Sequence, residues 1–152
     1  MNYIAAKCDA KLIGVGAKEQ VHVEMIIGIV MEMKNDVTGK FYITGDNALT
    51  KELVYWHLTG IENIFGGKHF LVSDNVTYVD FIFFEVLNLG GFRNHSKLFE
   101  EHRTIKAYVK RMKDLHNVRA FFESHAAQSI KFNKRLKRRT IGISLIYFQE
   151  FL

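Results

Sequence analysis

The sequence predicts an all-α protein, a single bundle of about five helices. Three observations lead to this fold class. The 152 residues include no proline, the residue that breaks helix interiors. Apolar residues recur at helical spacing over long stretches, as Met25, Ile29 and Met33 do. Residues 76–87 combine a helix start signal with an almost uninterrupted apolar run.

Residues 76–87 are expected to form the central, buried helix, because a helix that is apolar nearly all round needs burial on every side. Thr77 is predicted to be its N-cap, with the hydroxyl accepting a hydrogen bond from the N–H of Asp80. The Asp80 carboxylate is predicted to accept in return from the N–H of Thr77. Val76 and Phe81 are placed to form a hydrophobic staple across this start.

Two long helices are expected before the central one. The first spans residues 17–37, and the Thr38-Gly39-Lys40 sequence breaks or bends it. Its inward face is predicted from helical spacing to be Met25, Ile26, Ile29, Val30, Met33 and Val37. Ile27 and Met31 add a second apolar edge, so this helix needs a second partner besides the bundle. The second begins within residues 46–49 and runs to Phe65, and a glycine pair ends it. Its expected inward residues are Leu53, Trp56, Leu58, Ile61 and Ile64.

Shorter elements complete the bundle. Residues 2–12 form a short amphipathic piece, and residues 68–75 form a loop with its 70–72 segment tucked inward. After the central helix, Thr104 is expected to cap a helix with Ile105, Tyr108, Val109 and Met112 on one face. Asn117 is expected to cap a last short helix, with Val118, Phe121 and Phe122 inward.

The composition is that of a soluble globular domain, 48% hydrophobic and 24% charged. The single Cys8 excludes an internal disulfide and fits a reducing compartment. Residues 1–16 lack the pattern of a signal peptide. We therefore expect a cytoplasmic protein. The seven histidines never fall at helical i, i+4 spacing with a nearby acid, so no metal site is predicted.

The C-terminal segment, residues 135–152, differs from the rest. The formal charge of +5 is concentrated just before and within it, in a run without acids: Lys131, Lys134, Arg135, Lys137, Arg138 and Arg139. A solvated basic tail is the simplest interpretation, and an anionic-surface or nucleic-acid contact is the alternative. The apolar residues 141–152 that follow are too short to span a membrane. They are able to pack on the bundle, on a partner or at a membrane interface.

Four groups of residues carry a family resemblance. They are residues 2–7, 76–81, 85–89 and 105–111, which read NYIAAK, VTYVDF, EVLNL and IKAYVKR. Their order and spacing resemble the C-terminal, all-helical domain of mu-class glutathione transferases. The resemblance covers residues 2–134, with residues 2–12 similar to the end of the helix that precedes that domain. It implies glutathione as co-substrate, no other cofactor, and a homodimer or a thioredoxin-like partner.

The resemblance also implies roles for individual residues. Tyr42 falls on a pocket tyrosine whose hydroxyl assists addition to some electrophiles; packing of its ring is the equal alternative. Lys34 and Asn35 fall where the family has a histidine and an apolar pocket residue, which leaves the substrate preference open. Glu32 falls on an acid that reaches the glutathione of the partner subunit, with an exposed helix carboxylate as the favoured alternative. Thr77 and Asp80 are structural in either case.

The family's glutathione-activating tyrosine and cis-proline belong to a thioredoxin-like half with no counterpart in this sequence. We therefore expect the chain alone to have no catalytic residue and no activity. Two hypotheses remain: the electrophile-binding half of a mu-like glutathione transferase, or a non-catalytic subunit built on the same bundle. No nucleic-acid partner is expected.

Overall fold

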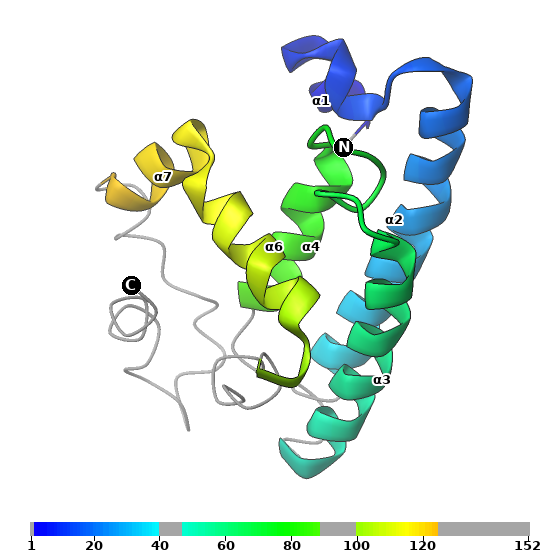
Figure 1. Cartoon of the computed structure of the whole chain (residues 1–152), viewed down its shortest axis with the longest axis vertical. Coiled ribbons are helices and arrows are strands. Elements are labelled where there is room, and N and C mark those ends of the chain that lie inside the picture. The colour runs from blue at the N-terminus through cyan, green and yellow to red at the C-terminus, as the bar shows by residue number, and fades with distance from the viewer. Residues whose placement is uncertain (1, 40–46, 89–99, 125–152) are drawn as a thin grey trace. The chain divides into compact units, whose positions relative to one another are not determined.

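The computed structural model describes residues 2–39, 47–88 and 100–124, drawn as ribbons in Figure 1. These residues form six α-helices, one short 3-10 helix and no strand, which confirms the predicted all-α class. The chain divides into two compact units, residues 1–109 and 110–152. The expected domain boundary at residue 134 falls outside the described residues and stays a prediction.

The N-terminal piece is two short helices. Helix α1 (Asn2–Cys8) is followed by the 3-10 helix η1 (Ala10–Ile13). Asp9 begins η1 by accepting the N–H of Lys11 at 2.9 Å. Gly14 then adopts a φ of +96°, a backbone conformation that residues other than glycine avoid. This turn leads directly into the long helix α2.

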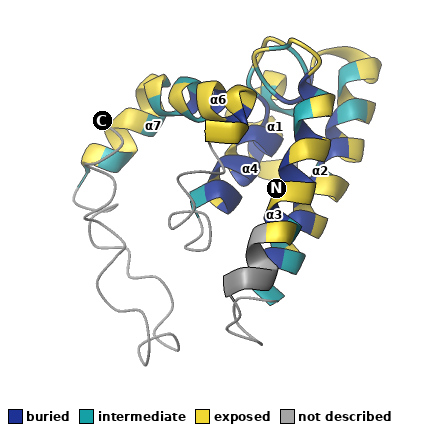
Figure 2. Cartoon of the chain, turned by 60° about the horizontal axis from the view of Figure 1, so that its bottom comes forward, coloured by how far each residue is buried: buried dark blue, intermediate teal, exposed yellow. Residues whose placement is uncertain are grey.

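Helix α2 (Gly16–Gly39) is the longest described helix and contacts both α3 and α4. Its buried face is Val23, Ile26, Val30, Met33 and Val37, spaced by three and four residues as one stripe of a helix requires. Met25 is 63% exposed and Ile29 37% exposed, so placing these two residues inward was wrong. Both are thus exposed apolar residues of α2, and Figure 2 shows how exposed positions run along this helix.

Helix α3 (Asn47–Phe65) lies beside α2 and is rotated relative to the predicted register. Its buried residues are Val54, His57, Leu58, Ile61 and Phe65. Trp56 is 66% exposed, so placing it inward was wrong, whereas Leu53 and Ile64, also predicted inward, are half-buried. The rotation arises because His57, polar and adjacent to Trp56, takes the inward place with an acid as its partner. Hydropathy alone assigned that place to Trp56.

A loop of tight turns connects α3 to α4. Gly66 and Gly67 have φ of +50° and +84° and end α3, as predicted. Leu71 and Val72 are buried, which confirms the inward tuck of this loop. The loop thereby delivers the chain to the start of the central helix.

Helix α4 (Tyr78–Asn88) is the buried helix that the sequence predicted. Eight of its eleven residues are buried: Tyr78, Val79, Asp80, Ile82, Phe83, Phe84, Val86 and Leu87. The ring of Phe83 lies 5.4 Å from that of Tyr108, and the ring of Phe65 lies 5.2 Å from it. This aromatic cluster joins α3, α4 and the start of the next helix. Phe81, the expected staple partner of Val76, is 36% exposed.

Helix α6 (Arg103–Asp114) buries Ile105, Tyr108 and Met112, as predicted, with Val109 half-buried. Its start is two residues earlier than expected. The carbonyl of His102 accepts the N–H of Lys106 at 3.0 Å, which places His102 in the N-cap position and Thr104 inside the first turn. The Thr104 capping prediction was therefore wrong.

Helix α7 (His116–Glu123) belongs to the second unit. Leu115 precedes it and makes no side-chain cap, and Asn117 lies inside its first turn, so the predicted Asn117 cap was wrong. Phe121 is 47% exposed and no α7 residue is buried, contrary to the inward placement of Val118, Phe121 and Phe122. Within this unit an exposed ion pair joins Arg119 and Asp114 at 3.0 Å.

Candidate functional site

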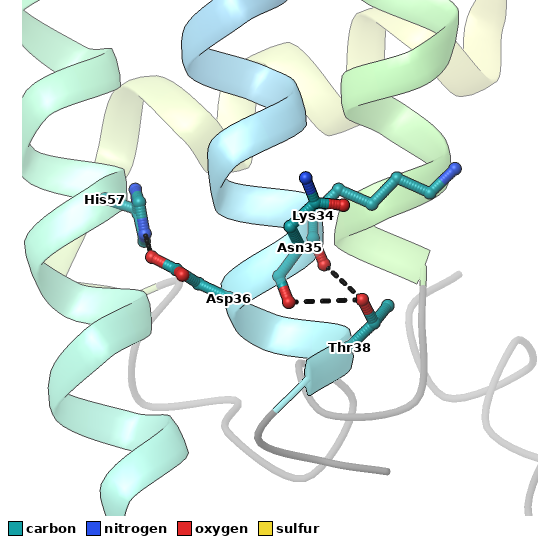
Figure 3. Close-up of polar contacts among 5 residues, drawn as sticks. All are labelled: Lys34, Asn35, Asp36, Thr38 and His57. Carbon is teal, nitrogen blue, oxygen red and sulfur yellow. Dashed lines mark hydrogen bonds and ion pairs between the residues drawn. The ribbon is translucent and has the colours of Figure 1, made fainter. Parts of the chain in front are cut away.

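The C-terminal half of α2 carries three of the predicted site residues. Glu32 and Asn35 are exposed, and Lys34 is half-buried. Figure 3 shows the Lys34 side chain leaving α2 away from α3, whereas Asp36 leaves toward it. Tyr42, the fourth predicted pocket residue, lies outside the described residues. The structure thus brings together Lys34 and Asn35 as neighbours on one turn, with Glu32 one turn earlier.

The end of α2 is closed by Thr38. Its hydroxyl donates to the carbonyl of Lys34 at 2.7 Å and to that of Asn35 at 3.3 Å (Figure 3). These carbonyls lie within the last two turns of α2, and threonine hydroxyls in helices often bond back to carbonyls three or four residues earlier. The Thr38 hydroxyl therefore contacts the backbone of both predicted pocket residues. Helix α2 ends one residue later at Gly39, where a break was predicted.

Beside these residues lies an ion pair that sequence analysis missed. The Nε2 of His57 on α3 is 3.0 Å from Oδ2 of Asp36 on α2 (Figure 3). The His57 side chain is 2% exposed and that of Asp36 is 43% exposed. The Trp56 ring packs edge-on to His57, with centroids 4.9 Å apart. The two partners are 21 residues apart on different helices. No spacing rule in the sequence therefore predicts the pair, which depends on how α2 and α3 are rotated relative to each other.

A second imidazole–carboxylate pair ties α3 to the start of α6 and was also missed. Glu62 accepts His102 Nδ1 with one oxygen at 2.8 Å and the N–H of Thr104 with the other at 3.1 Å. Glu62 therefore caps α6 from another helix, in place of the Thr104 side chain. The His102 side chain is 4% exposed. Its Nε2 is buried and makes no hydrogen bond in the described part of the chain.

Thr77 and Asp80 start α4, as expected of structural residues. The Asp80 carboxylate accepts the N–H of Thr77 at 2.8 Å, which confirms half of the predicted capping box. The other half was wrong, because the Thr77 hydroxyl donates to Asp80 Oδ2 at 2.9 Å. The N–H of Asp80 donates instead to the Thr77 carbonyl at 3.1 Å.

Two contacts of Asp80 come from distant parts of the chain. Its Oδ1 accepts the N–H of Leu71 at 3.0 Å, and its backbone carbonyl accepts the hydroxyl of Tyr108 at 2.8 Å. Burial raises the pKa of Asp80 above its ordinary value, and the hydrogen bonds from Leu71 and Thr77 oppose this rise. Asp80 is fully enclosed, so it serves the fold and is closed to a substrate.

An open, largely apolar groove lies between the N-terminal helices and α2. Its volume is about 750 Å³, and its lining residues are Tyr3, Ala6, Ile13, Ala17, Gln20, Val21, Glu24 and Met25. Tyr3, Val21 and Met25 are 75%, 58% and 63% exposed. Ile27 and Met31, the second apolar edge noted in the sequence, are not among its lining residues, so the sequence did not predict this groove.

Among the described residues, no group of three or more histidine, cysteine or acidic side chains is arranged to hold a metal ion. None of the helices in residues 2–39, 47–88 and 100–124 combines the length and apolar character needed to cross a bilayer.

Residues 35–125 match the family profile described as "Glutathione S-transferase, C-terminal domain". This match covers more than half of the chain and includes all of α3, α4, α6 and α7. The chain belongs to the glutathione transferase family. The resemblance found from the central helix and its neighbours is confirmed.

A relative shows the extent of this glutathione transferase likeness. "Glutathione S-transferase class-mu 26 kDa isozyme 51" of Fasciola hepatica is 27% identical over 132 residues. The alignment covers 82% of this chain and 57% of the relative. The chain therefore spans somewhat more than half the length of this glutathione transferase.

Proposed function

We propose that this chain is the electrophile-binding half of a mu-like glutathione transferase. In this proposal, glutathione is bound and activated by a thioredoxin-like half supplied outside residues 1–152. The observation that carries the proposal is the family match over residues 35–125, together with the coverage of 57% of a class-mu relative.

Lys34, Asn35 and Tyr42 are the proposed substrate-binding residues. Thr38 supports this role for the first two, since its hydroxyl holds both of their carbonyls at the end of α2. The Asp36–His57 pair supports it further by tying the same turn to α3. Tyr42 would donate a hydrogen bond to charge that develops on the electrophile during addition.

The test is a glutathione-conjugation assay with two proteins. One is the chain alone, and the other is the chain fused behind a thioredoxin-like domain taken from a glutathione transferase. We expect no activity from the chain alone and measurable activity from the fusion. Tyr42→Phe in the fusion should then lower kcat for substrates that build up negative charge, without changing the KM for glutathione. Strong activity from the chain alone would contradict the proposal.

A second candidate function is that of a non-catalytic subunit, and the apolar groove beside α1 favours it. Tyr3, Val21 and Met25 expose apolar surface there, and contiguous exposed apolar surface is typical of sites that bind another protein. This candidate predicts an inactive fusion and a stable protein complex. Capture experiments with the full chain and with a chain lacking residues 140–152 would show whether that segment is needed for the complex.

A further inference from the structure

Lys34 is a half-buried lysine near the end of α2. It makes no ion pair with any residue in the described ranges 2–39, 47–88 and 100–124. Its neighbours on the helix surface lie three and four positions away, and all four are uncharged: Val30, Met31, Val37 and Thr38. The Lys34 ammonium group is therefore free to bind an anion that comes from outside the described residues.

The acids nearest to Lys34 in the sequence lie on the other side of α2. Glu32 and Asp36 are each two residues from Lys34, and two residues correspond to about 200° around a helix. Figure 3 shows Asp36 leaving α2 toward α3, whereas Lys34 leaves it on the other side. Asp36 also has a partner already, since its Oδ2 lies 3.0 Å from His57 Nε2. The register of α2 thus separates Lys34 from both carboxylates.

The hydrogen-bonding groups of Lys34 and Asn35 suit a carboxylate. A lysine ammonium group has three donors and an asparagine amide has two, whereas an ionised carboxylate only accepts. Asn35 is exposed, so its amide is accessible to a ligand. A half-buried lysine buries its stem and keeps its ammonium group at the surface. Water weakens a charge contact there less than at a fully exposed lysine. This turn of α2 therefore has the donors and the charge to bind a carboxylate.

We propose that the electrophile bound by this half carries a carboxylate group. Lys34 binds that carboxylate through its ammonium group, and Asn35 donates a further hydrogen bond. Because only the proposed function assigns Lys34 and Asn35 to the electrophile site, this carboxylate specificity rests on that proposed function.

The carboxylate takes no part in the bond changes. Glutathione loses its thiol proton to solvent, and the thiolate attacks the electrophilic carbon. A carbon–sulfur bond forms with the sulfur electron pair, and the bond to the leaving group breaks. The leaving group departs with the electron pair of that bond. The contact with Lys34 therefore binds and orients the electrophile for a reaction that occurs elsewhere on the same molecule.

The experiment compares an acidic electrophile with its neutral ester. 4-Chloro-3,5-dinitrobenzoate carries a carboxylate opposite the reacting carbon, its methyl ester does not, and both lose chloride to glutathione. The protein is the full chain fused behind the thioredoxin-like domain of the conjugation assay. Each kcat/KM is divided by the rate constant of the uncatalysed reaction, which removes the difference in intrinsic reactivity. We expect the resulting value to be about tenfold higher for the acid than for the ester.

Substitutions of lysine test whether Lys34 causes this preference. Lys34→Met removes the charge but keeps the length of the side chain, and it should reduce the preference to about twofold or less. Lys34→Arg keeps the charge and should retain the preference. Lys18→Met is the matched control, because Lys18 is exposed on the same helix but lies about 24 Å along it from Lys34. That distance exceeds the screening length of about 8 Å at physiological ionic strength, so the preference should be unchanged.

The outcomes separate this specificity from the proposed function. A fusion that conjugates both electrophiles without preferring the acid, or a Lys34→Met variant that keeps the full preference, would overturn the carboxylate specificity alone. An equal loss in Lys18→Met and Lys34→Met would also overturn it, because the net charge would then be the cause. A fusion inactive toward both electrophiles would overturn the proposed function, and the carboxylate specificity with it.

Discussion

Asp80 shows how one buried side chain holds several segments together. Its two carboxylate oxygens accept three hydrogen bonds, one from Leu71 and two from Thr77, and both of these residues are fully buried. Because the Leu71 N–H has no access to water, losing its acceptor leaves a buried donor unsatisfied. Asp80 thus connects the loop after α3 to the first turn of α4.

We expect Asp80→Ala to lower the free energy of unfolding by about 2–4 kcal/mol, since it removes an acceptor from buried donors. Thr77→Ala should cost about 1 kcal/mol, because Asp80 keeps its other bonds. Thr77→Ser retains the hydroxyl and is the control, with a smaller loss expected. Urea unfolding followed by circular dichroism measures all three. A Thr77→Ala cost equal to or above that of Asp80→Ala would contradict this assignment.

The raised pKa of Asp80 gives a pH dependence with a definite sign. The folded protein binds the Asp80 proton more tightly than the unfolded chain, because burial penalises the ionised carboxylate. The Asp80 carboxyl group therefore makes its full contribution to the free energy of unfolding at pH values below its pKa in the unfolded chain, which is about 4. The contribution declines as the pH rises through the folded pKa.

The measurement is the difference in unfolding free energy between the unmodified chain and Asp80→Asn across pH. Asparagine has nearly the same shape but does not titrate in this range. As the pH rises from about 4, we expect the unfolding free energy of the unmodified chain to fall relative to that of Asp80→Asn, and the difference then to level off. A constant difference would show that the carboxyl has the same pKa in both states.

At this scale the sequence predicted part of the site. An acid three residues after a threonine, at the start of an apolar run, is a local signal, and it identified Asp80. The other contacts of Asp80 come from Leu71 and Tyr108, which are 9 and 28 residues away. Such contacts depend on how the loop and α6 pack, which no local pattern encodes.

At the scale of elements, α3 is linked to both neighbours by imidazole–carboxylate pairs. His57 reaches Asp36 of α2, and Glu62 reaches His102 and the N–H of Thr104. The apolar pattern predicted where α3 begins and ends but placed its buried face about one residue out of register. The reason is that His57 occupies an inward position which a hydropathy pattern gives to Trp56. The predicted start of α6 was wrong for a similar reason, because the acceptor at its N-terminus is Glu62 of another helix.

We expect Glu62→Ala to lower the free energy of unfolding by about 2–3 kcal/mol, since it removes acceptors from His102 and from the first turn of α6. Glu52→Ala is the matched control, because Glu52 is exposed on the same helix. That control should stay within about 0.5 kcal/mol of the unmodified chain. Equal effects of the two substitutions, measured by thermal unfolding, would show that the Glu62 cap contributes no stability.

At the scale of the whole molecule, folding of the helical bundle and the proposed binding of glutathione need different parts of the protein. The described helices bury a continuous core in residues 1–109 with Phe65, Phe83 and Tyr108 near its centre. The chain also carries an exposed apolar groove and aligns with 57% of a class-mu relative. Folding is therefore expected of this chain by itself, whereas glutathione binding is expected only when the proposed second half is present.

Glutathione should not change the unfolding temperature of the chain alone, because a ligand stabilises only a folded state that binds it. The fusion with a thioredoxin-like domain should be stabilised, by about 2.7 kcal/mol when glutathione is at 100 times its Kd. S-methylglutathione, which lacks the free thiol, separates binding from chemistry and should stabilise the fusion as well. Differential scanning calorimetry of both proteins makes the comparison. If glutathione raised the unfolding temperature of the chain alone by as much as that of the fusion, the glutathione site would lie within these 152 residues, and the proposed division of labour between two halves would be wrong.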